Sequence, residues 1–217
     1  MHVSQKKLLA CGNSEPSLVL DGLMVWLDGR DTISNNQVPD RVSGNSCAIT
    51  PNQLYLVNRP GAYYLIEAPN MYQRNLSVSV PSGITLTGVK TVEMSIKLLS
   101  TSNMGQGDTV FMSFFTSRYD WWRSTAFSGG IKAINAESTH MLSTTDGTIC
   151  KTYFNGVLIR SDNIAQLPDV TSIMEYRKPQ GSSGSIAYIG TIRVYNKTFS
   201  EKEVLNNYRY EIGLERY

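Results

Sequence analysis

Residues 184–217 read GSIAYIGTIRVYNKTFSEKEVLNNYRYEIGLERY, and this stretch changes its hydrophobic period once. From Ile189 to Tyr195 it is rich in β-branched and aromatic residues, which is typical of a strand. Ser200 and Glu203 then have the spacing of a capping box, in which each side chain satisfies a backbone N–H at the start of a helix. The stretch therefore predicts a strand followed by a short helix that closes the chain against a sheet.

The predicted helix has an apolar face and a polar face. Phe199 and Val204 stand at the two positions of a hydrophobic staple, which fixes the angle at which the chain enters the helix. We expect the helix to end near Gly213. Helical spacing relates its apolar residues, which are Val204, Leu205, Tyr208 and Ile212. The polar residues predicted on the other side are Glu201, Lys202, Asn206, Asn207 and Arg209.

The composition favours one β domain with an uncharged polar surface. The chain has 217 residues, a length at which β-sandwiches often remain undivided. Charged residues make up 18% of it, below the roughly 25% usual in globular domains, and the formal net charge is +2. Because the basic residues are scattered, we expect no nucleic-acid partner. No apolar run approaches the ~20 residues needed to cross a bilayer, so we expect no membrane partner.

Residues 1–16 show little periodic pattern and predict an N-terminal arm, followed by a single domain over residues 17–217. A run of only three apolar residues immediately precedes Cys11, whereas the apolar region of a signal peptide has roughly 7–15, so no signal peptide is expected. Cys11, Cys47 and Cys150 are far apart and odd in number. They predict reduced thiols rather than a disulfide scaffold.

Short apolar or alternating runs separated by turn residues fill the rest of the chain. In the run 91–99, alternation predicts that Val92 and Met94 point inward and that Glu93 is an exposed sheet residue. Residues 29–45 predict turns throughout, and Asp146-Gly147 and Asn155-Gly156 predict tight hairpin turns. The runs that predict strands are 17–28, 54–57, 62–66, 76–80, 91–99, 110–115, 131–134, 140–143 and 189–195. Many short strands at this spacing are typical of a sandwich.

Three segments, at both ends and in the centre, resemble one known family. Residues 189–211, IGTIRVYNKTFSEKEVLNNYRYE, are similar to the closing strand and helix of laminin-G-like, concanavalin A-like lectin domains. Residues 22–50 resemble the opening strand and loop of these domains, and residues 138–159 resemble their central hairpin. The resemblance implies an all-β, concanavalin A-like antiparallel β-sandwich (jelly roll) with a short C-terminal α-helix. It also implies that residues 23–27 pair with 189–195, because the first and last strands of jelly rolls are commonly neighbours.

Catalytic residue types are sparse. Glucanases of this fold place their carboxylates on one strand as E-x-D-x-x-E, whereas Glu93 is followed on its own face by Ser95 and Lys97. The two histidines, His2 and His140, have neither nucleophile-elbow nor metal-ligand spacing, and His140 falls where the family often carries a packing histidine. We therefore predict no enzymatic activity and no cofactor.

Calcium is a further possibility that the resemblance raises, since some relatives bind it with loop carboxylates. Asp28, Asp31 and Asp40 offer oxygen ligands, but no D-x-D-x-D spacing fixes a site. Loop carboxylates more often cap turns. We therefore predict no metal site.

The densest aromatic cluster is the candidate binding surface. On a strand, the two neighbouring tryptophans would point to opposite faces of the sheet. An exposed tryptophan flanked by polar groups could stack on a sugar ring while those groups bind hydroxyls. The same residue types are also enriched in cores and subunit contacts, so both interpretations stay open. The candidate residues are Tyr119, Asp120, Trp121, Trp122 and Arg123.

The leading hypothesis is a non-enzymatic structural or adhesion protein of a bacteriophage virion, such as a decoration, fibre or tail-associated subunit. The virion setting comes from the resemblance, because such chain endings are common in phage structural proteins and in bacterial surface proteins. Expected partners are other virion proteins, further copies of the chain as a homo-oligomer, and host-surface carbohydrate. The alternative is a secreted or cell-surface carbohydrate-binding lectin, located outside the cell or on the bacterial surface. A glycoside hydrolase is the third hypothesis.

Overall fold

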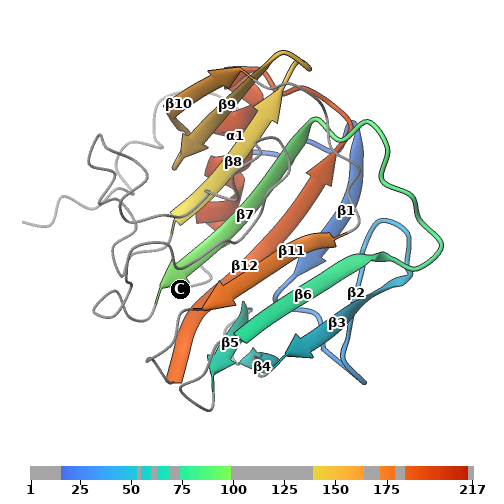
Figure 1. Cartoon of the computed structure of the whole chain (residues 1–217). Helices are drawn as coiled ribbons and strands as arrows, with labels where there is room; N and C mark the ends of the chain where they lie inside the picture. The colour runs from blue at the N-terminus through green and yellow to red at the C-terminus, as the bar shows by residue number, and fades with distance from the viewer. Residues whose placement is uncertain are drawn as a thin grey trace, which may run out of the picture.

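The computed structural model of the protein describes residues 16–52, 55–59, 63–68, 74–98, 139–163, 172–178 and 184–214 (Figure 1). These residues form twelve strands and one helix. Their bounds are β1 Leu23–Asp28, β2 Gln37–Pro39, β3 Ser46–Asn52, β4 Tyr55–Arg59, β5 Tyr63–Ala68, β6 Arg74–Pro81, β7 Thr91–Leu98, β8 Thr139–Thr145, β9 Ile149–Phe154, β10 Val157–Asn163, β11 Ser172–Lys178, β12 Gly184–Tyr195 and α1 Glu201–Gly213.

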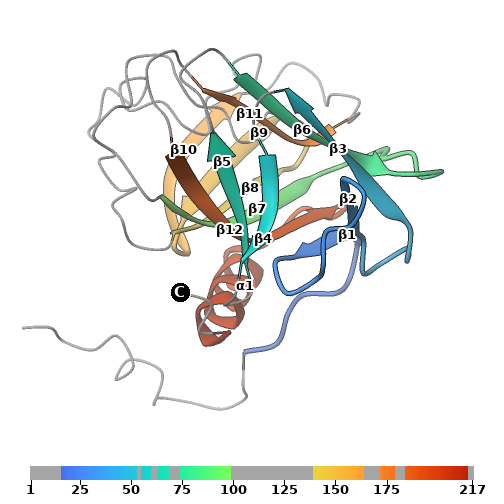
Figure 2. The ribbon, with the colours of Figure 1, turned by 90° about the horizontal axis from the view of Figure 1, so that it is seen from below.

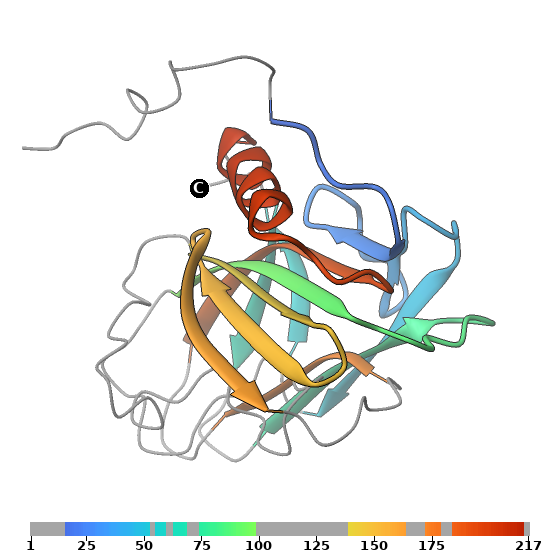
Figure 3. The ribbon, with the colours of Figure 1, turned by 90° about the horizontal axis from the view of Figure 1, so that it is seen from above.

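The strands form two antiparallel sheets that share one core. The larger sheet runs β10-β9-β8-β7-β12-β5-β4, with β1 also paired to β12, and the smaller runs β11-β6-β3-β2. One hydrophobic cluster contains Val25 and Met94 from the larger sheet together with Ile49 and Val78 from the smaller. Figure 3 shows the layers, with α1 on the outer side of the larger sheet. The chain is therefore an all-β, concanavalin A-like jelly-roll sandwich with a short C-terminal helix, as predicted.

The predicted pairing of the first and last strands is confirmed. In the β1–β12 ladder Leu23 lies opposite Tyr195, and Leu27 lies opposite Ile192. The other edge of β12 pairs with β7 along nearly its whole length. Because β12 holds β1, β5 and β7 together, the C-terminal strand is the centre of the larger sheet.

Strand β7 confirms half of its predicted alternation and contradicts the other half. Val92, Met94 and Ile96 point into the core and are fully buried, as expected. Glu93, predicted to be exposed, has no exposed surface, and Ser95 is also buried. The reason is that α1 covers this face of the sheet, where Ser95 Oγ donates to Glu211 Oε1 of α1 at 2.8 Å. The larger sheet is therefore covered on both faces at β7.

The predicted start of α1 is confirmed. The Ser200 N–H donates to Glu203 Oε2 at 2.9 Å, and the Glu203 N–H donates to Ser200 Oγ at 3.4 Å, which completes the capping box. Phe199 and Val204 are buried in one cluster with Tyr195. The helix ends at Gly213, and no helix in the described part of the chain is long and apolar enough to span a membrane.

The predicted buried face of α1 is wrong by about one position. The residues of α1 that are buried are Val204, Asn207 and Glu211, of which Asn207 was expected on the other side. Ile212, expected to be buried, is 40% exposed. The polar residues turn inward because the sheet below offers charged and hydrogen-bonding partners. Apolar spacing alone therefore misplaced the contact face.

Both predicted hairpin turns are present. Asp146 and Gly147 lie in the turn between β8 and β9, where Asp146 Oδ1 accepts from the Thr148 and Ile149 N–H groups at 2.8 and 2.9 Å. Asn155-Gly156 joins β9 to β10, and both residues have positive φ, 50° and 76°. Residues of this kind suit the tightest hairpin turns.

The interpretation of residues 29–45 as turns throughout is wrong in part. Gln37–Pro39 forms the short edge strand β2, which pairs with β3. Its three residues are too few to show an alternating pattern. The rest of the segment is ordered around Asp40, whose carboxylate accepts from the backbone N–H groups of Trp26 at 2.8 Å and Ser43 at 2.9 Å.

Gly22, immediately before β1, lies where the chain passes closest to the end of β12. A Cβ atom at Gly22 would lie 2.7 Å from Lys197 Cβ and 2.8 Å from Asn196 Oδ1, whereas one at Gly83 would meet nothing within 4 Å. The φ angles are nearly equal, 75° and 74°, so alanine costs about 1–2 kcal/mol of left-handed strain at either position. We expect Gly22→Ala to lose about 1 kcal/mol more than Gly83→Ala in urea unfolding, because of the added overlap. Equal losses would contradict this.

Candidate functional site

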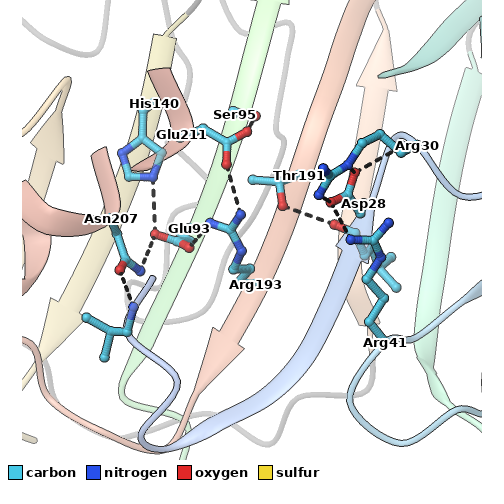
Figure 4. Close-up of polar contacts among 12 residues, drawn as sticks. Asp28, Arg30, Arg41, Glu93, Ser95, His140, Thr191, Arg193, Asn207 and Glu211 are labelled. Atoms are coloured by element: carbon cyan, nitrogen blue, oxygen red, sulfur yellow. Dashed lines mark hydrogen bonds and ion pairs between the residues drawn. The ribbon is translucent and has the colours of Figure 1, made fainter. Parts of the chain in front are cut away.

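The outer face of the larger sheet carries a cluster of polar side chains beneath α1 (Figure 4). Alternation places Glu93 on this face of β7 and Arg193 on this face of β12, and the strand register sets the two residues directly opposite each other. Neighbouring β8 contributes His140, and α1 contributes Asn207 and Glu211. We call these five residues, together with Ser95 and Tyr195, the buried cluster.

Arg193 is the centre of the buried cluster. Its Nη1 lies 2.6 Å from Glu93 Oε1, and its Nη2 lies 2.9 Å from Glu211 Oε2. The side chains of Arg193 and Glu93 have no exposed surface, and that of Glu211 is 3% exposed. Removing ions from water costs several kcal/mol each, which direct pairing offsets. The guanidinium therefore ties α1 to β7 and β12.

Glu93 receives three further donors. His140 Nε2 lies 3.1 Å from Oε2, Asn207 Nδ2 donates to Oε2 at 3.0 Å, and the Tyr195 hydroxyl donates to Oε1 at 3.1 Å. Asn207 also accepts the Val19 N–H at 2.9 Å through Oδ1, so the segment before β1 is tied to the cluster, beside α1 in Figure 2. Both oxygens of the Glu93 carboxylate are therefore saturated.

The electrostatics keep Glu93 and Arg193 ionised. Burial favours the neutral form of Glu93, but Arg193 and His140 outweigh it and lower the pKa of this carboxyl from 4.5 to about 2. Burial also opposes the charge on Arg193, yet the two glutamates outweigh it and raise the pKa of the guanidinium. Burial, followed by the charge of Glu93, raises the pKa of Tyr195, which keeps its proton as a donor.

This arrangement suits attachment of α1 rather than acid–base chemistry. A glycosidase requires one carboxyl as nucleophile or base and another, with raised pKa, as acid. Glu93 and Glu211 do lie near each other, but Arg193 bridges them, the pKa of Glu93 is lowered, and both side chains are buried between α1 and the sheet. His140, predicted to be a packing residue, is 3% exposed and its ring lies 6.0 Å from that of Tyr208.

A second group of charges surrounds Asp28, at the end of β1. The buried Asp28 carboxylate pairs with Arg30 and with Arg41, whose Nη1 lies 2.9 Å from Oδ2. Arg41 also pairs with Asp31, whose Oδ2 lies 2.7 Å from the Arg41 Nε. Asp28 and Asp31 are thus ion-paired and Asp40 holds backbone N–H groups. No group of three or more His, Cys, Asp or Glu residues that could hold a metal ion is found in the described ranges.

Trp26 lies within reach of both groups of charges. The guanidinium carbon of Arg41 is 5.0 Å from its ring centre, and that of Arg193 is 5.1 Å away. Such cation–π contacts contribute about 0.5–2 kcal/mol. Trp26 therefore lies between the Asp28 group and the buried cluster.

The five aromatic and polar candidates predicted from sequence, Tyr119, Asp120, Trp121, Trp122 and Arg123, lie outside the described residues, as does His2. The buried cluster was not predicted. Its sequence signal is weak, because Glu93, Arg193 and Glu211 are far apart along the chain and each sits in an ordinary amphipathic pattern. The strand register brings Glu93 and Arg193 together, and the packing of α1 on the sheet adds Glu211.

The fold of this chain is similar to that of several solved structures. No protein-family model and no curated protein matches the chain. Among solved structures it is similar to the botulinum neurotoxin serotype D binding domain, with a TM-score of 0.58 and 13% identity over 88% of this chain and 52% of that one. A structure of botulinum neurotoxin type C, whose cell entry depends on interaction with two ganglioside molecules, matches with a TM-score of 0.58 and 12% identity over 87% of this chain and 51% of that one.

A third similar structure is nearly the size of this chain. Domain 4 of AbnA, a GH43 extracellular arabinanase from Geobacillus stearothermophilus, was solved with arabinotriose, and it matches with a TM-score of 0.55 and 16% identity over 85% of this chain and 97% of that one. By contrast, the chain spans about half the length of the two neurotoxin chains. At these identities the likeness establishes the lectin-like jelly-roll fold.

Proposed function

We propose that the chain is a non-enzymatic carbohydrate-binding module that attaches its carrier to a glycan-bearing surface. The observation that carries this is the match to domain 4 of the arabinanase, a structure of the same fold covered over 97% of its length and solved with an oligosaccharide. The neurotoxin domains, one of them in complex with N-acetylneuraminic acid, add a second group of sugar binders with this fold. Because one fold can host many functions, sugar binding is the property to measure.

The absence of catalysis in this proposal is supported by the buried cluster. Glu93 and Glu211 are the glutamates that the fold brings together around Arg193, and each is committed to that guanidinium. Neither is open to a substrate, since both side chains are buried. A polysaccharide incubated with the protein should therefore release no reducing ends, and release that Glu93→Gln abolishes would contradict the proposal.

The proposed setting is the bacteriophage virion, with other virion proteins and host-surface carbohydrate as partners. It is supported by the resemblance of residues 189–211 to the chain endings of phage structural proteins. A secreted or cell-surface lectin is the alternative setting for the same binding activity. Mass spectrometry of purified particles and of secreted fractions would separate the two settings, because it locates the chain and gives its copy number.

Binding should depend on the aromatic cluster. A glycan array, followed by calorimetry on the best ligand, should detect binding that Trp121→Ala or Trp122→Ala weakens by about tenfold or more, the equivalent of a lost stacking contact of about 1.4 kcal/mol. Trp26→Phe is the matched control, because Trp26 contacts Arg41 and Arg193 of the same chain and should leave affinity unchanged. No binding across a broad array of bacterial and animal glycans would contradict the proposed function.

A further inference from the structure

One side of α1, next to its buried face, carries apolar residues that are partly or largely exposed. Figure 3 shows α1 standing on the outside of the larger sheet. Leu205 and Tyr208 are partly exposed, and Ile212 is 40% exposed. These positions lie three, four and seven residues apart, so they line one stripe of the helix beside the buried face.

The turn between β9 and β10 extends this stripe. A Cβ atom at Gly156 would lie 3.1 Å from Tyr208 Cδ1 and 3.2 Å from Leu205 Cδ1, so the turn is packed against the helix. The next two residues, Val157 and Leu158, are 64% and 43% exposed. We call Val157, Leu158, Leu205, Tyr208 and Ile212 the helix patch.

Two opposite charges flank Leu205 on the same line of the helix. Glu201 and Arg209 lie four residues before and four residues after it, and both are exposed. Neither forms an ion pair with any described residue. Eight residues of helix separate them by about 12 Å, which is too far for an ion pair with each other. Along the helix axis, this line therefore carries a negative charge at Glu201, an apolar side chain at Leu205 and a positive charge at Arg209.

We propose that the helix patch is the contact between two copies of this chain, with α1 antiparallel to α1 of the second copy about a two-fold axis at Leu205. In a two-fold interface residue i of one copy meets residue j of the other and the reverse. Here Leu205 meets Leu205, and Glu201 of each copy meets Arg209 of the other. The helix dipoles also run in opposite directions, which favours antiparallel packing. A second copy is thus the partner whose charges complement this face.

The interface is small, so the dimer should be concentration-dependent. A helix of 13 residues is about 20 Å long and buries less than the roughly 800 Å² per partner of a stable standard interface. The helix patch adds the exposed side chains of Val157 and Leu158, which is consistent with a weak, reversible association. Attachment proteins gain overall affinity when weak sites are linked in pairs.

Sedimentation of the full chain over about 1–500 μM tests the proposal. The weight-average mass should rise with concentration from 24.1 kDa towards twice that value. Glu201→Arg and Arg209→Glu should each weaken dimerisation about tenfold, because each places like charges opposite one another in both symmetric pairs. The double variant, with both charges exchanged, should restore the original dissociation constant. Far-UV circular dichroism and urea unfolding check that each variant is folded, and both sites are exposed and outside the buried cluster.

Each result of these measurements either supports or overturns the proposed dimer. A chain that remains monomeric over the whole range overturns the proposal. So does a dimer that neither single exchange weakens, or one that the double exchange fails to restore, since that dimer uses another surface. Leu205→Asp is a second check, because it places two carboxylates at the axis and should leave only monomer.

Discussion

Replacing Arg193 by methionine should lower the free energy of unfolding by about 3–5 kcal/mol, the usual cost of removing one partner from a buried ion pair. Methionine fills a similar volume, so the loss comes mainly from charge rather than from a cavity. Without the guanidinium, Glu93 and Glu211 would be left as neighbouring carboxylates buried between α1 and the sheet. Urea unfolding followed by circular dichroism gives the difference directly.

Arg30 provides the matched control for this prediction. It pairs with Asp28, but its side chain is 39% exposed, and exposed pairs contribute about 0–1 kcal/mol. Arg30→Met should therefore cost far less than Arg193→Met. Similar losses for the two variants would contradict the central place of Arg193. Replacing Glu93, Arg193 and Glu211 together by apolar residues of matching size should recover much of the loss, because no uncompensated charge then remains.

Acid should weaken the fold through Glu93. Its pKa is about 2 in the folded chain and about 4.5 when unperturbed, so the unfolded chain binds the proton more readily. The stabilisation is therefore complete above about pH 4.5 and is lost as the pH falls through the folded value near 2. A shift of this size corresponds to a contribution on the order of 3 kcal/mol. The urea midpoint should fall steeply between these two pH values.

Two measurements identify Glu93 as the source of that acid sensitivity. The carboxyl carbon-13 resonance of Glu93 should keep its ionised chemical shift at pH 3.5, where an ordinary glutamate is mostly protonated. The Glu93→Gln variant should show a shallower dependence of stability on pH. A resonance that titrates near 4.5 would show that the contacts with Arg193 and His140 do not hold the charge.

The features that the sequence predicted well depend on neighbours along the chain. The capping box of Ser200 and Glu203 and the turns at Asp146-Gly147 and Asn155-Gly156 are satisfied by atoms within a few residues. The pairing of β1 with β12 is not local and followed from the resemblance at the two chain ends. Short β2, with three residues, offered no pattern to detect.

The features that were missed depend on what covers a surface. Alternation in β7 places Glu93 and Ser95 on the face opposite Met94, but it does not say whether water or a helix lies there. The contact face of α1 was misassigned for the same reason. Asn207 is buried because Glu93 and Tyr195 lie beneath it and accept hydrogen bonds from its amide group. Two errors thus share one origin, a polar interface between helix and sheet. The sequence shows that both the helix and the strands carry charged residues, but it does not show which of these residues face each other.

The bond between the Val19 N–H and Asn207 Oδ1 holds the segment before β1 against α1. The segment by which the chain enters the sandwich and the helix by which it leaves therefore lie side by side. A carrier joined at either end would hold the domain on the side of α1. The opposite layer, with Gln37, Ala48 and Thr50 exposed on the smaller sheet, would then be the side presented outward.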